Sequence, residues 1–268
     1  ITSTNRGVYI TTSGTTLTLT DNTINSGEIS IYASGIESGE ITGNSCEGSS
    51  GNWAIEISSC NDCVFEANTV NYLGGHGIKS NSSSGTTIED NTINIGGSGI
   101  YAESGVSLEI TINTITGFTS YGIRFESTSQ TSIHNNSLVS TPGGDSGNYG
   151  IYNGNTNSYG NAVYANDIHI LNADDNVEGI RASRADVYDN TILIDNGGSE
   201  NFGIRGEDNT VFNNNINLFA NSSSYAIYNT TSYSSRAIYS NQIELNGASG
   251  IKGNQLHIHD NDITGSGT

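Results

Sequence analysis

Residues 187–192, Val-Tyr-Asp-Asn-Thr-Ile, contain a pattern that returns along the whole 268-residue chain. In each copy an apolar residue precedes an Asn by three positions, and Ile, Val, Leu or Cys follows the Asn by two. Most steps between successive copies are 22 to 24 residues. The Asn residues in this register are Asn22, Asn44, Asn68, Asn91, Asn113, Asn136, Asn166, Asn190, Asn214, Asn241 and Asn261.

A second register of Ile and Val has the same period. Each member follows a small residue and precedes a large polar or aromatic one. Its members are Val8, Ile31, Ile55, Ile78, Ile100, Ile123, Ile151, Ile180, Ile204, Ile227 and Ile251. Two independent markers with one period indicate a repeat protein of eleven units.

The content of each unit predicts the fold. Short alternating apolar runs are broken by Gly, Asn, Ser and Asp, which is typical of strands and turns. Leucine-rich repeats share the period but need a Leu lattice that this chain lacks. A coil of about 23 residues holds three short strands and three turns, and coils about 4.8 Å apart form a solenoid. We therefore predict an all-β parallel β-helix that spans residues 1–268 as one domain.

The recurring Asn suits the bends of such a solenoid. Asn tolerates the left-handed backbone conformation that a tight bend requires. Its amide can also bond to the Asn of the next coil, which would satisfy buried polar groups at the bend. We predict an internal Asn ladder.

Composition excludes several classes of protein. The chain has 34 Gly, one Pro and a net charge of −19 from eight basic and 27 acidic residues. Gly and Asn disfavour helices, and the negative charge disfavours nucleic acid as a partner. The sequence contains no apolar run long enough to span a membrane. Richness in Asn, Ser, Thr and Gly suggests a secreted or cell-surface protein, present here as a mature form or an excised domain.

The three cysteines, Cys46, Cys60 and Cys63, lie within 18 residues. A zinc site usually draws four ligands from paired clusters, and the sequence has no second cluster. We expect one local disulfide and one buried thiol, with the pairing left open. A redox role for Cys60-x-x-Cys63 is the alternative, although such motifs usually begin a helix.

With both registers in place, the chain resembles the pectate-lyase-like superfamily of right-handed parallel β-helices, in its generic repeat form. The resemblance covers essentially the whole chain. It implies the fold but no single function, because that superfamily includes lyases, hydrolases, phage tailspikes, surface adhesins and purely structural repeats.

The residues that follow the second register form the most informative column. Alternation along a strand turns them outward on one sheet. The column contains Tyr9, Tyr32, Glu56, Lys79, Tyr101, Arg124, Tyr152, Arg181, Arg205, Tyr228 and Lys252. Five of the eight basic residues are here, beside a column of Gly, Ala and Ser that we expect to form a shallow groove.

We call this column the basic–aromatic strip. From it we predict a binding surface made of Lys79, Tyr101, Arg124, Tyr152, Arg181, Arg205, Tyr228 and Lys252. An anionic or sugar polymer, or a neighbouring subunit, would suit it, because Tyr and Arg dominate such contacts. A solvated ladder in which Arg stacks on Tyr is the equally weighted alternative.

Longer loops suggest a second place for a site. They fall at about 139–149, 169–179, 193–203 and 217–226, and the second of them contains Asp174, Asp175 and Glu178. These acids have the oxygen ligands that calcium prefers. Plain surface loops are the favoured interpretation, so we predict no cofactor and no metal site.

The segment Gly75-His76-Gly77 resembles one element of the polygalacturonase family. The paired aspartates that precede this element in that family are missing here. We therefore expect His76 to belong to an outward aromatic column with Trp53, Tyr121, Tyr149, Phe202 and Tyr225.

Two functions from different classes follow. No capping segment is evident, so coils of different copies could stack end to end. We rank such a self-assembling filament, sheath or surface shaft first, with copies of the chain as its partners. The alternative is a secreted protein that binds or cleaves an acidic polysaccharide. We lean away from an enzyme and assign no catalytic residue; if the chain is an enzyme, a polysaccharide lyase is expected.

Overall fold

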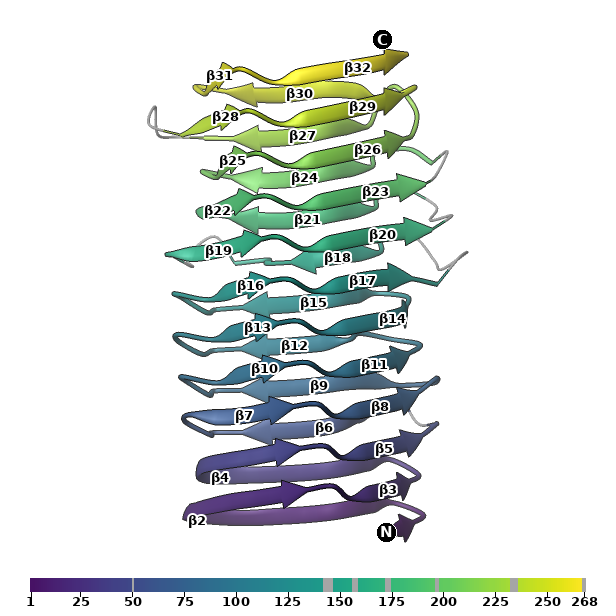
Figure 1. Ribbon diagram of the computed structural model, residues 1–268, viewed down its shortest axis with the longest axis vertical. Helices are drawn as coiled ribbons and strands as arrows, with labels where there is room; N and C mark the ends of the chain where they lie inside the picture. Colours follow the sequence, from purple (N-terminus) through teal and green to yellow (C-terminus); the bar gives the residue numbers. More distant parts are fainter. Residues whose placement is uncertain are drawn as a thin grey trace.

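The chain forms an elongated β-solenoid. The computed structural model describes residues 1–49, 51–141, 147–155, 159–171, 175–195, 198–231 and 236–266. Within these ranges the regular elements are all strands, which stack into about eleven parallel turns with the two termini at opposite ends (Figure 1). The predicted fold is confirmed.

The strands form three columns that run along the solenoid. The first column contains β2 (Arg6–Thr20), β4 (Ile29–Thr42), β6 (Trp53–Ser58), β9 (His76–Asn81), β12 (Ile100–Glu103), β15 (Tyr121–Glu126), β18 (Tyr149–Tyr152), β21 (Glu178–Ser183), β24 (Phe202–Glu207), β27 (Tyr225–Thr230) and β30 (Ser249–Asn254). The second contains β7 (Cys63–Glu66), β10 (Thr87–Glu89), β13 (Glu109–Thr111), β16 (Ser132–His134), β19 (Asn161–Tyr164), β22 (Ala185–Tyr188), β25 (Thr210–Phe212), β28 (Ala237–Tyr239) and β31 (His257–His259).

The third column contains β1 (Thr2–Ser3), β3 (Thr23–Ser26), β5 (Ser45–Gly48), β8 (Thr69–Tyr72), β11 (Thr92–Ile95), β14 (Thr114–Phe118), β17 (Ser137–Ser140), β20 (Asp167–Leu171), β23 (Thr191–Asp195), β26 (Asn215–Phe219), β29 (Gln242–Asn246) and β32 (Asp262–Ser266). In the first two coils, β2 and β4 run unbroken through the positions of both the first and second columns. Three short strands per coil therefore hold only from the third coil onward.

Parallel pairing places equivalent residues of successive coils side by side. In the first column Ile78 pairs with Ile100, and Ile100 pairs with Ile123. In the second column Ile88, Ile110 and Ile133 align in the same way, so both apolar registers become continuous columns of the core. Most members are fully buried, and the exceptions lie in the terminal coils.

The predicted Asn ladder is confirmed. Asn91 illustrates it: its Nδ2 donates to Oδ1 of Asn113 at 2.9 Å, and its backbone N–H donates to the same oxygen at 3.1 Å. The Asn91 Nδ2 also donates to the backbone oxygens of Phe65 and Glu89. Side-chain amide links of 2.8–3.1 Å connect all eleven Asn residues of the register.

The left-handed bend residue was assigned to the wrong position. It is the residue before each ladder Asn, not the Asn itself, that has a positive φ. These residues are Asp21, Gly43, Ala67, Asp90, Ile112, Asn135, Ala165, Asp189, Asn213, Ser240 and Asp260. The Asn is selected by its amide alone, and the bend tolerates many residue types.

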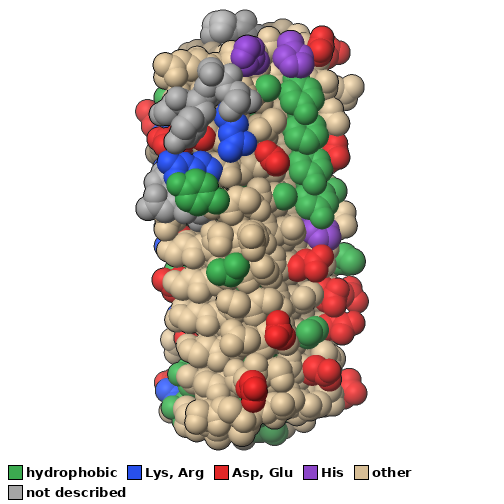
Figure 2. Space-filling view, turned by 90° about the vertical axis from the view of Figure 1, so that its left-hand side faces the viewer, with side chains coloured by type: hydrophobic (Ala, Val, Ile, Leu, Met, Phe, Trp, Pro, Cys, Tyr) green, Lys and Arg blue, Asp and Glu red, His purple; other side chains and the backbone are tan. Residues whose placement is uncertain are grey.

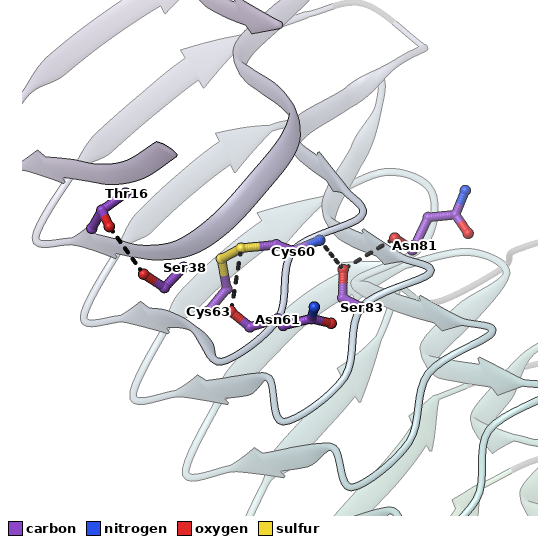
Figure 3. The surroundings of a disulfide bond; sticks show 7 residues. All are labelled: Thr16, Ser38, Cys60, Asn61, Cys63, Asn81 and Ser83. Carbon is purple, nitrogen blue, oxygen red and sulfur yellow. Dashed lines mark hydrogen bonds between the residues drawn. A yellow bond between two sulfur atoms is a disulfide. The ribbon is translucent and has the colours of Figure 1, made fainter. Parts of the chain in front are cut away.

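The cysteines follow the expected arrangement. Cys60 and Cys63 form a disulfide across the turn between β6 and β7, and Cys46 is a buried thiol (Figure 3). The Cys60 N–H donates to Ser83 Oγ, which bonds onward to the Asn81 carbonyl of the next coil. Burial raises the pKa of the Cys46 thiol to about 12, so this sulfur is unreactive at neutral pH.

Ile112 offers a test of the bend. It is a β-branched residue at φ 57° whose side chain is 53% exposed. A left-handed backbone costs an L-residue about 1–2 kcal/mol, and Asn tolerates it better. We predict that Ile112→Asn raises the free energy of unfolding by about 1 kcal/mol, measured by denaturant titration.

Val106 provides the matched control, because it is 44% exposed and lacks the positive φ. Val106→Asn should bring no stabilisation. An equal gain in both variants would show that removing an exposed apolar side chain, not relief of the backbone, is the cause.

Candidate functional site

The basic–aromatic strip lies on the outer face of the first strand column, as its alternation with the buried Ile column requires. Side chains of successive coils contact one another along it. Arg124 lies over Tyr101 with 4.9 Å between the guanidinium carbon and the ring centroid, and Arg181 lies over Tyr152 at 5.5 Å. Lys79 also lies against Tyr101, and both Arg205 and Lys252 lie against Tyr228.

Acidic side chains neutralise much of the positive charge. Lys79 pairs with Glu56 at 3.2 Å, and Arg124 pairs with Glu126 at 2.8 Å. Tyr101 donates to Glu126, and its pKa is raised by burial and by the nearby negative charge of Glu126. This half of the strip has the stacked, internally paired arrangement expected of a structural ladder.

The small-residue column does not form the expected groove. Gly99 and Gly179 are buried, and they face the Ile residues of the third column, not solvent. A Cβ atom on Gly179 would lie 2.5 Å from Ile192 Cγ2 and 2.6 Å from the Gly203 carbonyl oxygen. These glycines are required because first-column backbone packs directly on third-column side chains.

A pocket does occur farther along the strip, over β18, β21, β24 and β27. It has a volume of about 330 Å³ and is lined by Asn153, Gly154, Arg181, Ser183, Arg205, Gly206, Glu207, Tyr228 and Thr230. Three predicted strip residues, Arg181, Arg205 and Tyr228, therefore line one concavity. Lys79, Tyr101, Arg124, Tyr152 and Lys252 do not line it.

The two arginines of the pocket share a buried carboxylate. Glu178 Oε1 accepts from Arg205 Nη1 at 3.1 Å and lies 3.4 Å from Arg181 Nη1, while the Glu178 side chain is only 2% exposed. Burial raises the Glu178 pKa, and the positive charges of the two arginines oppose that rise. Glu178 Oε2 is buried, and no described residue forms a hydrogen bond with it.

Sequence reasoning did not identify this role of Glu178. The residue occupies the outward aromatic column, where it pairs in register with Tyr149 on one side and Phe202 on the other. The sign of this role in the sequence was a carboxylate at a position where neighbouring coils have an aromatic ring. The same column includes His76, which stacks on Trp53 at 4.7 Å, as expected.

Among the described residues, none of the long loops contributes to the lining of the pocket. Its lining residues come from the strands and from the turns that follow them, at the opposite ends of those strands from the loops. Asp174 lies outside the described residues, and Asp175 accepts hydrogen bonds from the Ser199 N–H and hydroxyl. The prediction of no metal site stays a prediction.

A second aromatic feature was missed entirely. Six rings stack along the outer face of the second column, with centroids 4.6–5.2 Å apart and planes within 12° of parallel: His134, Tyr164, Tyr188, Phe212, Tyr239 and His259. Figure 2 shows a ridge of hydrophobic side chains with histidine at both ends. Each ring stands two residues before a ladder Asn, which is a signal present in the sequence.

The fold and the strip define a β-helix solenoid with a polar pocket on its first strand column. The model of the family described as periplasmic copper-binding protein (NosD) matches residues 1–181, and the chain belongs to this family. That description agrees with the expected location outside the cytoplasm. No curated protein matches the sequence.

Solved structures confirm the right-handed β-helix fold. An alginate lyase from Paenibacillus sp. is 12% identical, with a TM-score of 0.54 over 95% of this chain and 99% of that one. The Streptococcus pneumoniae surface protein and adhesin PfbA is 14% identical, with a TM-score of 0.57 over 88% and 67% of the two chains.

The Dettilon tailspike protein is 12% identical, with a TM-score of 0.56 over 91% of this chain and 55% of that one. The chain also spans about half, 48%, of the length of a DFA-IIIase from Arthrobacter chlorophenolicus, at 15% identity and a TM-score of 0.46. At these identities the likeness concerns the fold.

The family description raises the question of copper. Copper sites are built from convergent imidazole, thiolate and thioether ligands. The chain has no Met, and two of its three Cys residues form a disulfide. Among the described residues, His, Cys, Asp and Glu nowhere gather in a group of three or more suited to a metal ion. The described part of the chain therefore does not fit a closed copper site.

The described residues also include no helix long and apolar enough to cross a membrane.

Proposed function

We propose that this chain is a β-helix protein of the periplasm or cell surface that binds an acidic polysaccharide, with its main contact at the pocket of Arg181 and Arg205. The observation that supports this most is the pairing of two guanidinium groups in one concavity of a strongly acidic protein. A chain with a net charge of −19 would otherwise repel a polyanion.

The chemistry of the lining suits a uronate. The planar guanidinium fork matches a carboxylate in two-point geometry. Glu207, Asn153, Ser183 and Thr230 provide acceptors and donors for sugar hydroxyls, and Tyr228 provides an aromatic surface. Stacking of Arg205 on Phe202, with 4.5 Å between the guanidinium carbon and the ring centroid, reduces the conformational entropy that binding would otherwise cost.

The proposal is one of binding, and catalysis is left outside it. Cleavage by a lyase needs a base beside the proton that it removes, and no residue of the pocket is assigned that role. The likeness to an alginate lyase concerns the fold alone.

Substitution of the pocket arginines tests the proposal. Arg181→Ala combined with Arg205→Ala should weaken binding of alginate or pectate oligosaccharides by at least tenfold, measured by calorimetry at low salt. Arg236→Ala removes a partly buried arginine away from the pocket, where it pairs with Asp186, and should leave affinity unchanged. Absorbance from unsaturated ends in the same samples reports cleavage.

A variant that should change the affinity in the opposite direction provides a second test. Glu178→Gln removes the carboxylate that the two arginines share, so it should strengthen binding of the anionic oligosaccharides severalfold. If neither oligosaccharide is retained by the native protein, or if all these variants bind alike, the proposed site is wrong.

Self-assembly is the second candidate. Successive coils pair in parallel register through their backbones, as β28 does with β31 and β29 with β32. We propose that copies of the chain stack through the same parallel backbone pairing that joins successive coils.

Electron microscopy and light scattering of the concentrated protein test this proposal. Filaments or discrete oligomers that Ile263→Asp disperses are the expected result. Monomers alone at high concentration would rule out assembly of this chain.

A further inference from the structure

A buried carboxylate contacts both arginines of the polysaccharide pocket. Glu178 is the first residue of β21, and its side chain is 2% exposed, whereas those of Arg181 and Arg205 are 37% and 36% exposed. Nη1 of each arginine donates to the same oxygen, Glu178 Oε1, at 3.4 Å and 3.1 Å. Both arginines also line the pocket. One carboxylate is therefore shared by the two groups that we expect to bind the ligand.

The two oxygens of this carboxylate have unequal surroundings. Oε1 accepts from the arginines, whereas Oε2 is buried and no described residue donates to it. An ionised carboxylate only accepts hydrogen bonds, and burial of an acceptor without a donor is costly. A proton on Oε2 removes the charge and with it much of this cost. Burial accordingly raises the pKa of Glu178, against the opposing positive charges of the two arginines.

The neighbouring strands add little further charge around Glu178. From β18, Tyr149 pairs in register with Glu178, and its pKa is raised by burial and by the charge of Glu178, so it stays neutral. From β24, Phe202 pairs with Glu178, and Arg205 is the charged group that contacts it. Strands β20 and β23 also pack against β21, but their titratable side chains point outward from the third column: Asp167, His169 and Asp195.

We propose that Glu178 couples the binding of an acidic polysaccharide to the uptake of a proton, so that the pocket binds its ligand more tightly as the pH falls. This inference rests on the proposed function of the pocket. An anionic group held by Arg181 and Arg205 lies near Glu178 and repels its carboxylate, so the ligand favours the protonated form. The proton comes from the solvent and returns to it when the ligand leaves.

The direction of the pH effect follows from thermodynamic linkage. The bound ligand raises the pKa of Glu178 above its value in the free protein, so affinity is lowest above both pKa values and highest below both. Each pKa unit between the two states corresponds to a tenfold change in affinity. Carboxyl groups with ordinary pKa values, such as those of a uronate, remain ionised down to about pH 5, so the ligand keeps its charge in this range.

Calorimetric titration of the full chain from about pH 7.5 to about pH 5 tests the coupling, with alginate or pectate oligosaccharides, whichever the native protein binds more tightly. The native affinity should rise by about three- to tenfold over this range. Glu178→Gln should bind tightly at both ends of the range, without this rise. The matched control is Glu126→Gln, because Glu126 pairs with Arg124 outside the pocket, and it should keep the native pH dependence.

Proton uptake by the native chain gives a second readout that depends on no variant. Titrations in buffers of different ionisation enthalpy should show that binding takes up a fraction of a proton in the native protein and none in Glu178→Gln. Native binding without pH dependence or proton uptake would overturn the coupling and leave the pocket standing, as would a native-like pH dependence in Glu178→Gln. Absence of binding at every pH would instead overturn the proposed function, and the coupling with it.

Discussion

The structure depends on one repeated interaction, the side-chain amide that passes from each ladder Asn to the next. At every coil the Asn oxygen accepts two N–H groups of the preceding coil's Asn, and its nitrogen donates to backbone carbonyls at the bend. A bend buried inside a solenoid would otherwise leave these groups unpaired, at a cost of about 1–3 kcal/mol each. The amide therefore fixes the corner at which every coil turns.

Because each coil bends at the same ladder Asn, the parallel register of all three strand columns is fixed. With each coil in step, equivalent positions align into columns, and side chains of a kind come into contact over long distances. The six-ring stack, the buried Ile columns and the basic–aromatic strip are consequences of the same alignment. The pocket arises where one column departs from its pattern: Glu178 replaces an aromatic ring and holds two arginines beside each other.

The periodic features could be predicted from sequence because each of them is repeated about eleven times. The Asn ladder, the two apolar registers and the outward strip all have this support. Features that depend on the backbone dihedral angles of individual residues could not be predicted in this way. The positive φ before each Asn is shared by Asp, Ala, Ile and Ser, so no residue type marks it. The glycine column was assigned to the outer surface because strict alternation was assumed, whereas Gly122 and Ile123 are consecutive and both buried.

The ladder itself is tested most directly by measuring the unfolding of Asn136→Ala, whose side chain is buried and bonds to Asn113 and Asn166. The matched control is Asn94→Ala, because Asn94 is exposed and its amide bonds at the surface to Asn71 and Thr116. The account predicts that Asn136→Ala lowers the free energy of unfolding by about 3 kcal/mol or more, and that the control changes it by less than about 0.5 kcal/mol. Equal, small losses in the two variants would contradict the claim that the amide ladder holds the coils in register.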